Sequence, residues 1–163
     1  MSKKIEWKED AEVVGIAMEV MSKFEEMFAG LDIKKIRFIR ILDKKADKIN
    51  EVKAVGFPFN IDNSYVYYFM TNNLKWKLLN DQQKNLAVMN GLYTIAEGGT
   101  DESSVNYGTK RKKDIEDYSI VLAAAGGRYD WQTPGASDLP NILGGENETK
   151  ADEIEQKGDS END

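Results

Sequence analysis

Apolar residues recur every three or four positions in the first part of the chain, between Val13 and Leu31. This spacing places them on one face of an α-helix, which can then be buried in a core. Gly30 lies near the end of the pattern, and glycine commonly terminates helices. The pattern therefore predicts a helix over about residues 13–31 that packs one face against the rest of the domain.

Three short segments that follow are rich in β-branched or aromatic residues, which favour strands over helices. They are Ile33 to Leu42, Val52 to Phe59 and Tyr65 to Thr71. Because side chains alternate between the two faces of a strand, one of Tyr67 and Tyr68 should lie in the core and the other outside it. We expect these segments to form one small mixed β-sheet.

Two further helices are predicted in the second half of the chain. Asn80 followed by Gln83 matches a capping box, in which each side chain satisfies a free backbone N–H of the first turn, so a helix is expected over residues 81–96. Another is expected over about residues 113–127, with carboxylates in its first turn, where the helix dipole favours them. The sheet and about three helices predict one α+β domain over residues 1–143.

The residue composition narrows the chemistry that such a domain can perform. The chain of 163 residues contains no Cys and no His. Disulfides, thiolate nucleophiles and zinc bound by thiolate or imidazole are therefore excluded, together with the most common general base. Carboxylates, lysines, tyrosines and hydroxyls remain as groups on which an enzyme could rely.

The net charge is unevenly distributed along the chain. Of the formal charge of −7, residues 144–163 carry −6, because they hold eight Asp and Glu against two Lys, and residues 1–143 carry the remaining −1. The low hydrophobicity and high charge of residues 144–163 predict a disordered acidic tail. The nearly neutral domain argues against an acidic DNA mimic and against a broadly basic nucleic-acid binder.

Nothing in the sequence predicts contact with a membrane. No segment approaches the roughly 20 consecutive apolar residues that a membrane span needs. The N-terminal residues also lack the apolar core of a signal peptide. We therefore expect a soluble intracellular protein without a membrane partner.

Two predicted helices, together with the order of the elements, resemble a known family. The segment from Asp81 to Ala96 contains Val-Met-Asn-Gly-Leu-Tyr-Thr-Ile-Ala, and it resembles the helix that carries His-Glu-x-x-His in the phage metallopeptidase domain, a zincin-like family of bacteriophages and prophages. The segment from Lys113 to Tyr118 resembles the opening of the last helix of that family, which begins with His-Asp. The resemblance covers about residues 10–131 and implies a zincin-like α+β fold and a place in the cytoplasm of a bacterial host.

The zinc-site residues of that family are all replaced in this chain. Carried over position by position, the three zinc ligands fall on Asn90, Thr94 and Lys113, and the general-base glutamate falls on Gly91. Asn and Thr are poor zinc ligands, Gly cannot accept a proton, and the Lys ammonium repels a dication. The resemblance therefore implies a protein that is not an enzyme, holds no metal or cofactor, and acts by binding a protein of host or phage, for example in host takeover or as an anti-defence inhibitor.

Three of the replaced positions belong to one side of the predicted helix over residues 81–96, and this side carries small residues. At 100° per residue, Ala87, Asn90, Gly91 and Thr94 lie on one side, opposite the larger apolar residues. The favoured interpretation is that this side packs closely against a neighbouring helix or lies in solvent. The alternative is a remodelled pocket for a partner or a small ligand.

The basic run Lys110, Arg111, Lys112 and Lys113 is an alternative binding site. It would suit a phage accessory factor that associates with nucleic acid. The run has no interleaved aromatic residues, and the sequence places Asp114, Glu116 and Asp117 directly after it, so a solvated surface is the favoured interpretation.

Aromatic and acidic residues supply the remaining candidates. Tyr67 and Trp131 could stack on a base or contact a protein, although core packing is favoured for such residues. A non-zinc enzyme could use carboxylates around a hard cation, which needs only oxygen ligands. The acids concerned show no recognised loop spacing; they are Asp101, Glu102, Asp114, Glu116 and Asp117.

Overall fold

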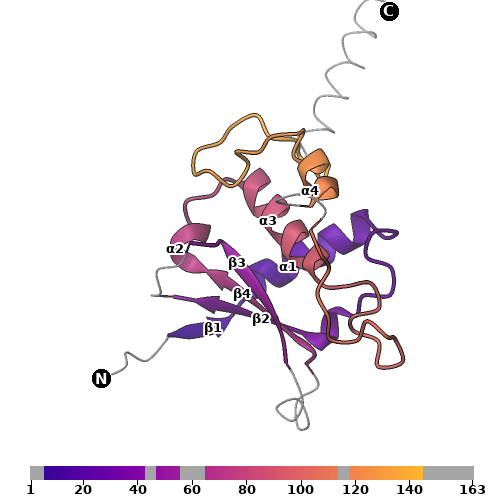
Figure 1. Ribbon diagram of the computed structural model, residues 1–163. Coiled ribbons are helices and arrows are strands. Elements are labelled where there is room, and N and C mark those ends of the chain that lie inside the picture. The colour runs from indigo at the N-terminus through magenta and orange to yellow at the C-terminus, as the bar shows by residue number, and fades with distance from the viewer. Residues whose placement is uncertain (1–5, 43–46, 56–64, 114–117, 145–163) are drawn as a thin grey trace, which may run out of the picture.

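The computed structural model describes residues 6–42, 47–55, 65–113 and 118–144 (Figure 1). Its strands are β1 (Trp7–Glu9), β2 (Ile36–Ile41), β3 (Asn50–Ala54) and β4 (Tyr67–Asn72). They form one sheet in the order β1-β2-β4-β3. β2 and β4 are parallel, whereas the two outer pairs are antiparallel, so the sheet is mixed as expected.

Helices cover one face of this sheet. The α-helices in the described part of the chain are α1 (Ala11–Lys23), α2 (Asn73–Trp76), α3 (Asp81–Thr94) and α4 (Ser119–Ala124), and a 3₁₀ turn (Ile33–Lys35) leads into β2. Figure 1 shows α1 and α3 next to each other on the same side of the sheet. The α+β fold class expected from the sequence is therefore confirmed. No helix in the described residues is long and apolar enough to cross a membrane.

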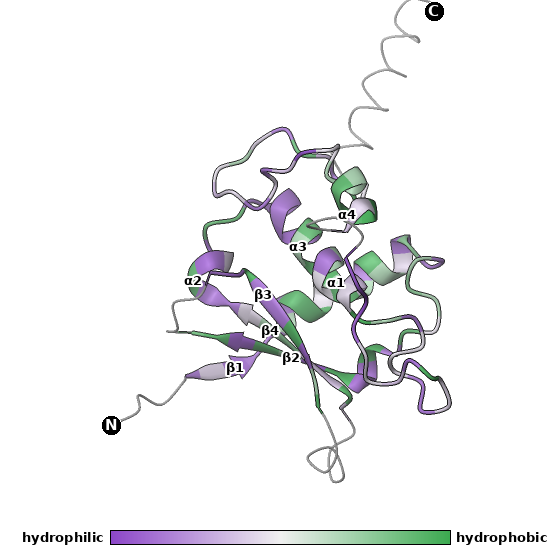
Figure 2. Ribbon diagram, viewed as in Figure 1, coloured by the Kyte–Doolittle hydropathy of each residue, from purple (hydrophilic) through white to green (hydrophobic). Residues whose placement is uncertain are grey.

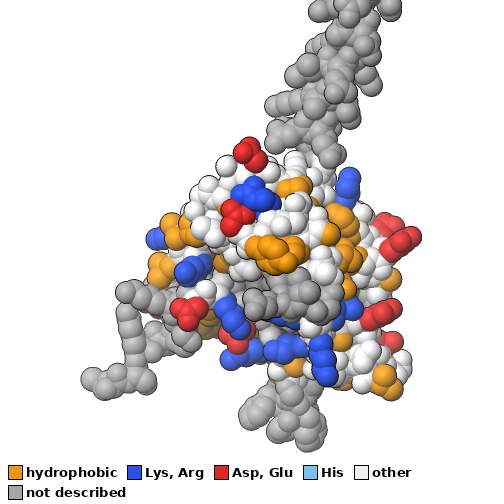
Figure 3. Space-filling view, turned by 45° about the horizontal axis from the view of Figure 1, so that its top comes forward, with side chains coloured by type: hydrophobic (Ala, Val, Ile, Leu, Met, Phe, Trp, Pro, Cys, Tyr) orange, Lys and Arg blue, Asp and Glu red, His pale blue; other side chains and the backbone are white. Residues whose placement is uncertain are grey.

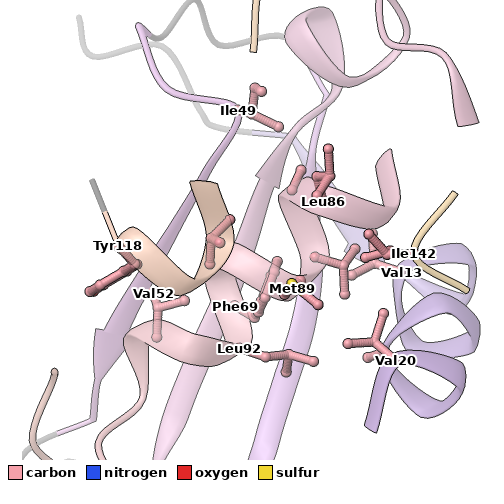
Figure 4. Packing of buried hydrophobic residues seen from close by; sticks show 14 of the residues in the cluster. Val13, Val20, Ile49, Val52, Phe69, Leu86, Met89, Leu92, Tyr118 and Ile142 are labelled. Carbon is pink, nitrogen blue, oxygen red and sulfur yellow. The ribbon is translucent and has the colours of Figure 1, made fainter. Parts of the chain in front are cut away.

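The core lies around α3, between the sheet and α1. Leu86, Met89 and Leu92 of α3 are at most 1% exposed. Figure 4 shows them between Phe69 of β4 and Val20 of α1. Figure 2 shows hydrophobic residues along α1, α4 and the strands, and a hydrophilic first part of α3. The buried half of α3 thus holds the two layers together.

The start of α3 follows from its local sequence. The side chain of Asn80 accepts from the N–H of Gln83 at 2.9 Å, and the side chain of Gln83 accepts from the N–H of Asn80 at 3.0 Å. This is the capping box that the sequence predicts. Gln83 is fully buried, and its Nε2 also donates to the carbonyls of Trp131 and Thr133. The cap therefore positions the C-terminal segment as well as the helix.

Two helix boundaries differ from the expectation. α1 ends at Lys23, because the following residues form turns that bring Phe28 into the core, and Gly30 takes a φ of +78° there. α4 begins at Ser119, and Lys113 lies outside it. The expected carboxylates of its first turn, at 114–117, lie outside the described residues. The expected end of α4 is confirmed, since Gly126 and Gly127 both have positive φ.

A buried ion pair joins the start of α1 to the sheet, and the sequence patterns do not predict it. Arg40 of β2 and Asp10 are 5% and 4% exposed. Nε of Arg40 donates to Oδ2 of Asp10 at 2.6 Å, and Nη2 donates to Oδ1 at 3.0 Å. Oδ1 of Asp10 also accepts from the N–H of Val13 and so caps α1. One carboxylate therefore begins a helix and neutralises a buried guanidinium.

Glu12 extends this ion pair toward α2 and α3. Its Oε1 accepts from Arg40 Nη2 at 3.2 Å and from Trp76 Nε1 at 3.0 Å, and its Oε2 lies 3.5 Å from Lys84 Nζ. Burial raises the pKa of Glu12, but the hydrogen bonds from Trp76 and Arg40 outweigh it and leave the pKa below its ordinary value. We interpret the network as structural, because its central pair has almost no contact with solvent.

Candidate functional site

A cavity of about 310 Å³ lies between α3, β3 and residues 110–113. Ala87, Asn90 and Thr94 of α3 line one side of it, and Lys113 lines it as well. Residues four apart on a helix point to the same side, which is why Asn90 and Thr94 meet the cavity together. The structure thus brings together the three positions to which the family resemblance assigns zinc ligands.

Residues 110–113 are held against the C-terminal end of α3. The N–H of Arg111 donates to the carbonyl of Thr94 at 2.7 Å, and Arg111 Nε donates to the carbonyl of Tyr93 at 3.0 Å. The guanidinium also lies 4.1 Å from the ring centroid of Tyr93. The last carbonyls of a helix lack donors within it and favour a nearby cation, so Arg111 completes the end of α3.

The hydroxyls of Thr94 and Tyr118 contact each other in the cavity wall, between α3 and the start of α4. The Thr94 hydroxyl donates to the carbonyl of Asn90 at 3.0 Å, and the hydroxyl of buried Tyr118 lies 3.2 Å from Thr94 Oγ1 and 3.2 Å from the carbonyl of Arg111. Figure 4 shows Tyr118 close to Val52 of β3, which lines the same cavity. Within the described part of the chain, no donor reaches the buried Oδ1 of Asn90. One acceptor at the cavity wall is therefore left without a partner there.

Gly91 does not face the cavity. A Cβ at this position would lie 2.3 Å from Cζ of Phe69 on β4, so the glycine allows α3 to approach the sheet. The close packing expected for the small-residue side is therefore found at Gly91, against a strand and not against a helix. The other three residues of that side, Ala87, Asn90 and Thr94, line the cavity.

The described wall of the cavity is predominantly basic. Its charged residues are Lys48, Lys110, Arg111 and Lys113 against the single carboxylate of Glu51. Figure 3 shows Lys and Arg side chains gathered on the lower part of the face turned toward the viewer. A wall of this composition attracts carboxylates and phosphates and repels metal dications.

The other binding candidates occupy different places. Trp131 lines the cavity but is only 1% exposed, so it acts as a rigid wall. Lys112 is exposed and is not part of the cavity lining. Tyr67 is 0% exposed, and its hydroxyl donates to the carbonyl of Thr109, which places it in the core. Tyr68 is the outward member of the pair, as alternation along the strand predicts.

The buried phenol of Tyr67 is expected to make the protein sensitive to alkali. Burial raises the pKa of Tyr67 to about 12, and nearby Tyr107 contributes in the same direction. The folded state thus favours the neutral phenol, so this stabilisation is complete below the ordinary pKa of 10.0 and is lost as the pH rises toward about 12. Urea unfolding at several pH values should show a steeper loss of stability across this range in the wild type than in Tyr67→Phe. Identical slopes in the two proteins would contradict the assignment.

The acidic candidates do not form a metal site among the residues that the structure places. No three Asp or Glu side chains gather there. The carboxylate of Asp101 instead accepts from the hydroxyl and the N–H of Ser103, and these hydrogen bonds lower its pKa. Asp114, Glu116 and Asp117 lie outside the described residues.

The sequence analysis missed the contribution of the segment that leads into β3. Lys48, Asn50 and Glu51 line the cavity. Asn50 Nδ2 donates to the carbonyl of Ala87 at 2.9 Å, which fixes the strand to α3 beside the cavity. The local sequence of this segment, with Lys48, Glu51 and Lys53 around Val52, is typical of a strand at a sheet edge and does not indicate a binding site.

Comparison with known proteins does not assign the chain to a group. No family model, no curated protein and no solved structure matches it. The functional argument therefore depends on the residues of the cavity and on the charges that surround it.

Proposed function

We propose that the protein is a catalytically inactive, metallopeptidase-like phage or prophage protein that binds a protein partner through the basic cavity. The partner, of host or phage origin, presents an acidic segment to Lys48, Lys110, Arg111 and Lys113. Such binding would serve host takeover or the inhibition of a host defence in the bacterial cytoplasm.

The charge of the cavity wall carries this proposal. Asn90 and Thr94 occupy two positions that the family resemblance assigns to zinc ligands, and Lys113 occupies the third. A lysine ammonium repels a dication at a distance where it attracts a carboxylate. The residues present therefore favour recognition of an acidic group over hydrolysis by metal-bound water.

An acidic protein segment suits this cavity better than a nucleic acid. The volume of about 310 Å³ is at the lower end of ligand pockets and accommodates a few side chains. Nucleic-acid binding spreads phosphate contacts along a groove or a broad surface. Asn90 Oδ1 has no donor among the described residues and could accept from a backbone N–H of such a segment, whereas the sugar-phosphate backbone of a nucleic acid carries no N–H donor.

Charge reversal in the cavity is expected to remove the binding of an acidic peptide. The probe is a fluorescein-labelled oligoglutamate, the variant combines Lys110→Glu with Lys113→Glu, and fluorescence anisotropy at low salt gives the affinity. Each exposed ion pair contributes up to about 1 kcal/mol, and reversal replaces two attractions by repulsions. We expect the affinity to fall by at least about tenfold, which corresponds to roughly 1.4 kcal/mol.

A matched variant separates the site from the overall charge. Lys34→Glu combined with Lys77→Glu changes the charge by the same amount at two exposed lysines outside the cavity lining, and it should retain most of the affinity. An equal loss in both variants, or no binding by the wild type, would contradict the proposal. Tighter binding of duplex DNA that depends on Lys110 and Lys113 would instead assign the site to nucleic acid.

A further inference from the structure

The basic cavity and the C-terminal segment of the same chain carry opposite charges. The described cavity lining has four cationic side chains and one carboxylate. Residues 145–163 hold eight Asp and Glu and two Lys. We propose that residues 145–163 bind in the cavity when no partner is present and compete with the acidic segment of the partner. This inference rests on the proposed function, because it concerns regulation of the same site.

Residues 145–163 continue from a segment of the chain that itself lines the cavity. Trp131 and Gln132 line the cavity, and the chain from there to Gly144 is anchored in the core, where Leu139 and Ile142 are each 8% exposed. The 19 residues of 145–163 span up to about 65 Å when fully extended. A flexible chain of that length has a mean end-to-end distance of about 25 Å. The length of the segment therefore does not limit its access to the cavity.

Attachment to the same chain compensates for weak individual contacts. Ion pairs between exposed Lys and Glu side chains are weak and are screened by salt. A segment on the same chain nevertheless has an effective concentration on the order of millimolar at a site that it can reach. A partner in solution has to displace this segment, so its apparent affinity is reduced by the fraction of cavities that the segment occupies.

A spin label on the C-terminal segment tests the contact directly. The chain has no cysteine, so Ser160→Cys provides a unique labelling position in the full-length protein. We expect a nitroxide there to broaden the backbone amide NMR signals of Asn90, Thr94 and Lys110 relative to the reduced label. The signal of Met18, which is 58% exposed on α1 and outside the cavity lining, should keep its intensity.

Either high salt or charge reversal in the cavity should abolish the broadening. High salt shortens the screening length to about 3 Å at 1 M, and the combination of Lys110→Glu and Lys113→Glu removes the cationic wall. The combination of Lys34→Glu and Lys77→Glu should leave the broadening in place. The inference is overturned if the cavity signals keep their intensity, if all surface signals broaden equally, or if charge reversal in the cavity has no effect.

Addition of oligoglutamate separates this inference from the proposed function. Competition predicts that the cavity signals recover over the same range of oligoglutamate concentration in which the peptide binds. Broadening at the cavity that persists, with no binding of oligoglutamate, at peptide concentrations well above the effective millimolar concentration of the segment supports the internal contact and contradicts the proposed function. Binding of oligoglutamate without broadening at the cavity supports the proposed function and overturns the internal competitor.

Discussion

Replacement of Arg40 by methionine is expected to lower the free energy of unfolding by about 3–5 kcal/mol, because it leaves the carboxylate of Asp10 buried without its partner. The variant also loses the hydrogen bonds from Arg40 to Glu12 and Asn73. Methionine has a similar length and no polar atoms that need partners, so the loss reflects charge more than volume. Urea unfolding followed by circular dichroism measures the effect.

A second arginine on the same strand provides the matched control. Arg37 pairs with Glu9 at 2.6 Å, but the two side chains are 30% and 62% exposed. Solvent therefore screens this pair, and Arg37→Met should cost less than about 1 kcal/mol. Adding Asp10→Asn to Arg40→Met removes the buried charge and keeps an N-cap residue, so it should recover part of the stability. Equal effects of the two arginine substitutions would contradict this account.

Substitution of Gly91 is expected to have the second largest effect. In Gly91→Ala the new Cβ meets Cζ and Cε2 of Phe69 at 2.3 and 2.4 Å. That ring is fully buried and lies 5.1 Å from the ring of Phe38, so it cannot move aside without disturbing the core. Overpacking of this kind costs about 1–3 kcal/mol, which exceeds the gain of up to about 1 kcal/mol from helix propensity. Gly91→Leu should be more destabilising still.

Gly15 in α1 is the matched control for helix propensity. A Cβ there would meet nothing within 4 Å, so Gly15→Ala should stabilise the protein by up to about 1 kcal/mol in the same denaturation assay. In a Phe69→Leu background, which shortens the side chain opposite Gly91, the cost of Gly91→Ala should decrease. If Gly91→Ala instead stabilises the protein as Gly15→Ala does, α3 does not approach the sheet as closely as the structure indicates.

The elements predicted correctly are those whose determining contacts are local. The capping box at Asn80 and Gln83 is made within one helical turn, so its residues could be recognised directly. The alternation of Tyr67 and Tyr68 follows from the geometry of a single strand. β1 and α2 were missed because three or four residues are too short to show a hydrophobic period.

Errors arose where a distant packing partner overrides the local pattern. The apolar period of α1 continues beyond Lys23, but the core takes up Phe28 from a turn, and the helix ends earlier. Arg40 shares one face of β2 with the buried Ile36 and Phe38, and its charge is tolerated there because Asp10 neutralises it from outside that strand. The sequence of β2 alone does not reveal that partner.

By itself, the sequence determined the fold class, the position of α3, the side of that helix that carries small residues, and the absence of thiol and imidazole chemistry. Only the tertiary structure decided how that side is used. Gly91 meets Phe69 of the sheet, whereas Asn90 and Thr94 meet a cavity with Lys48 and Lys113. Helical periodicity gives the direction in which each side chain points from the helix axis. The residues that this side chain then contacts depend on how chain segments far apart in sequence pack together.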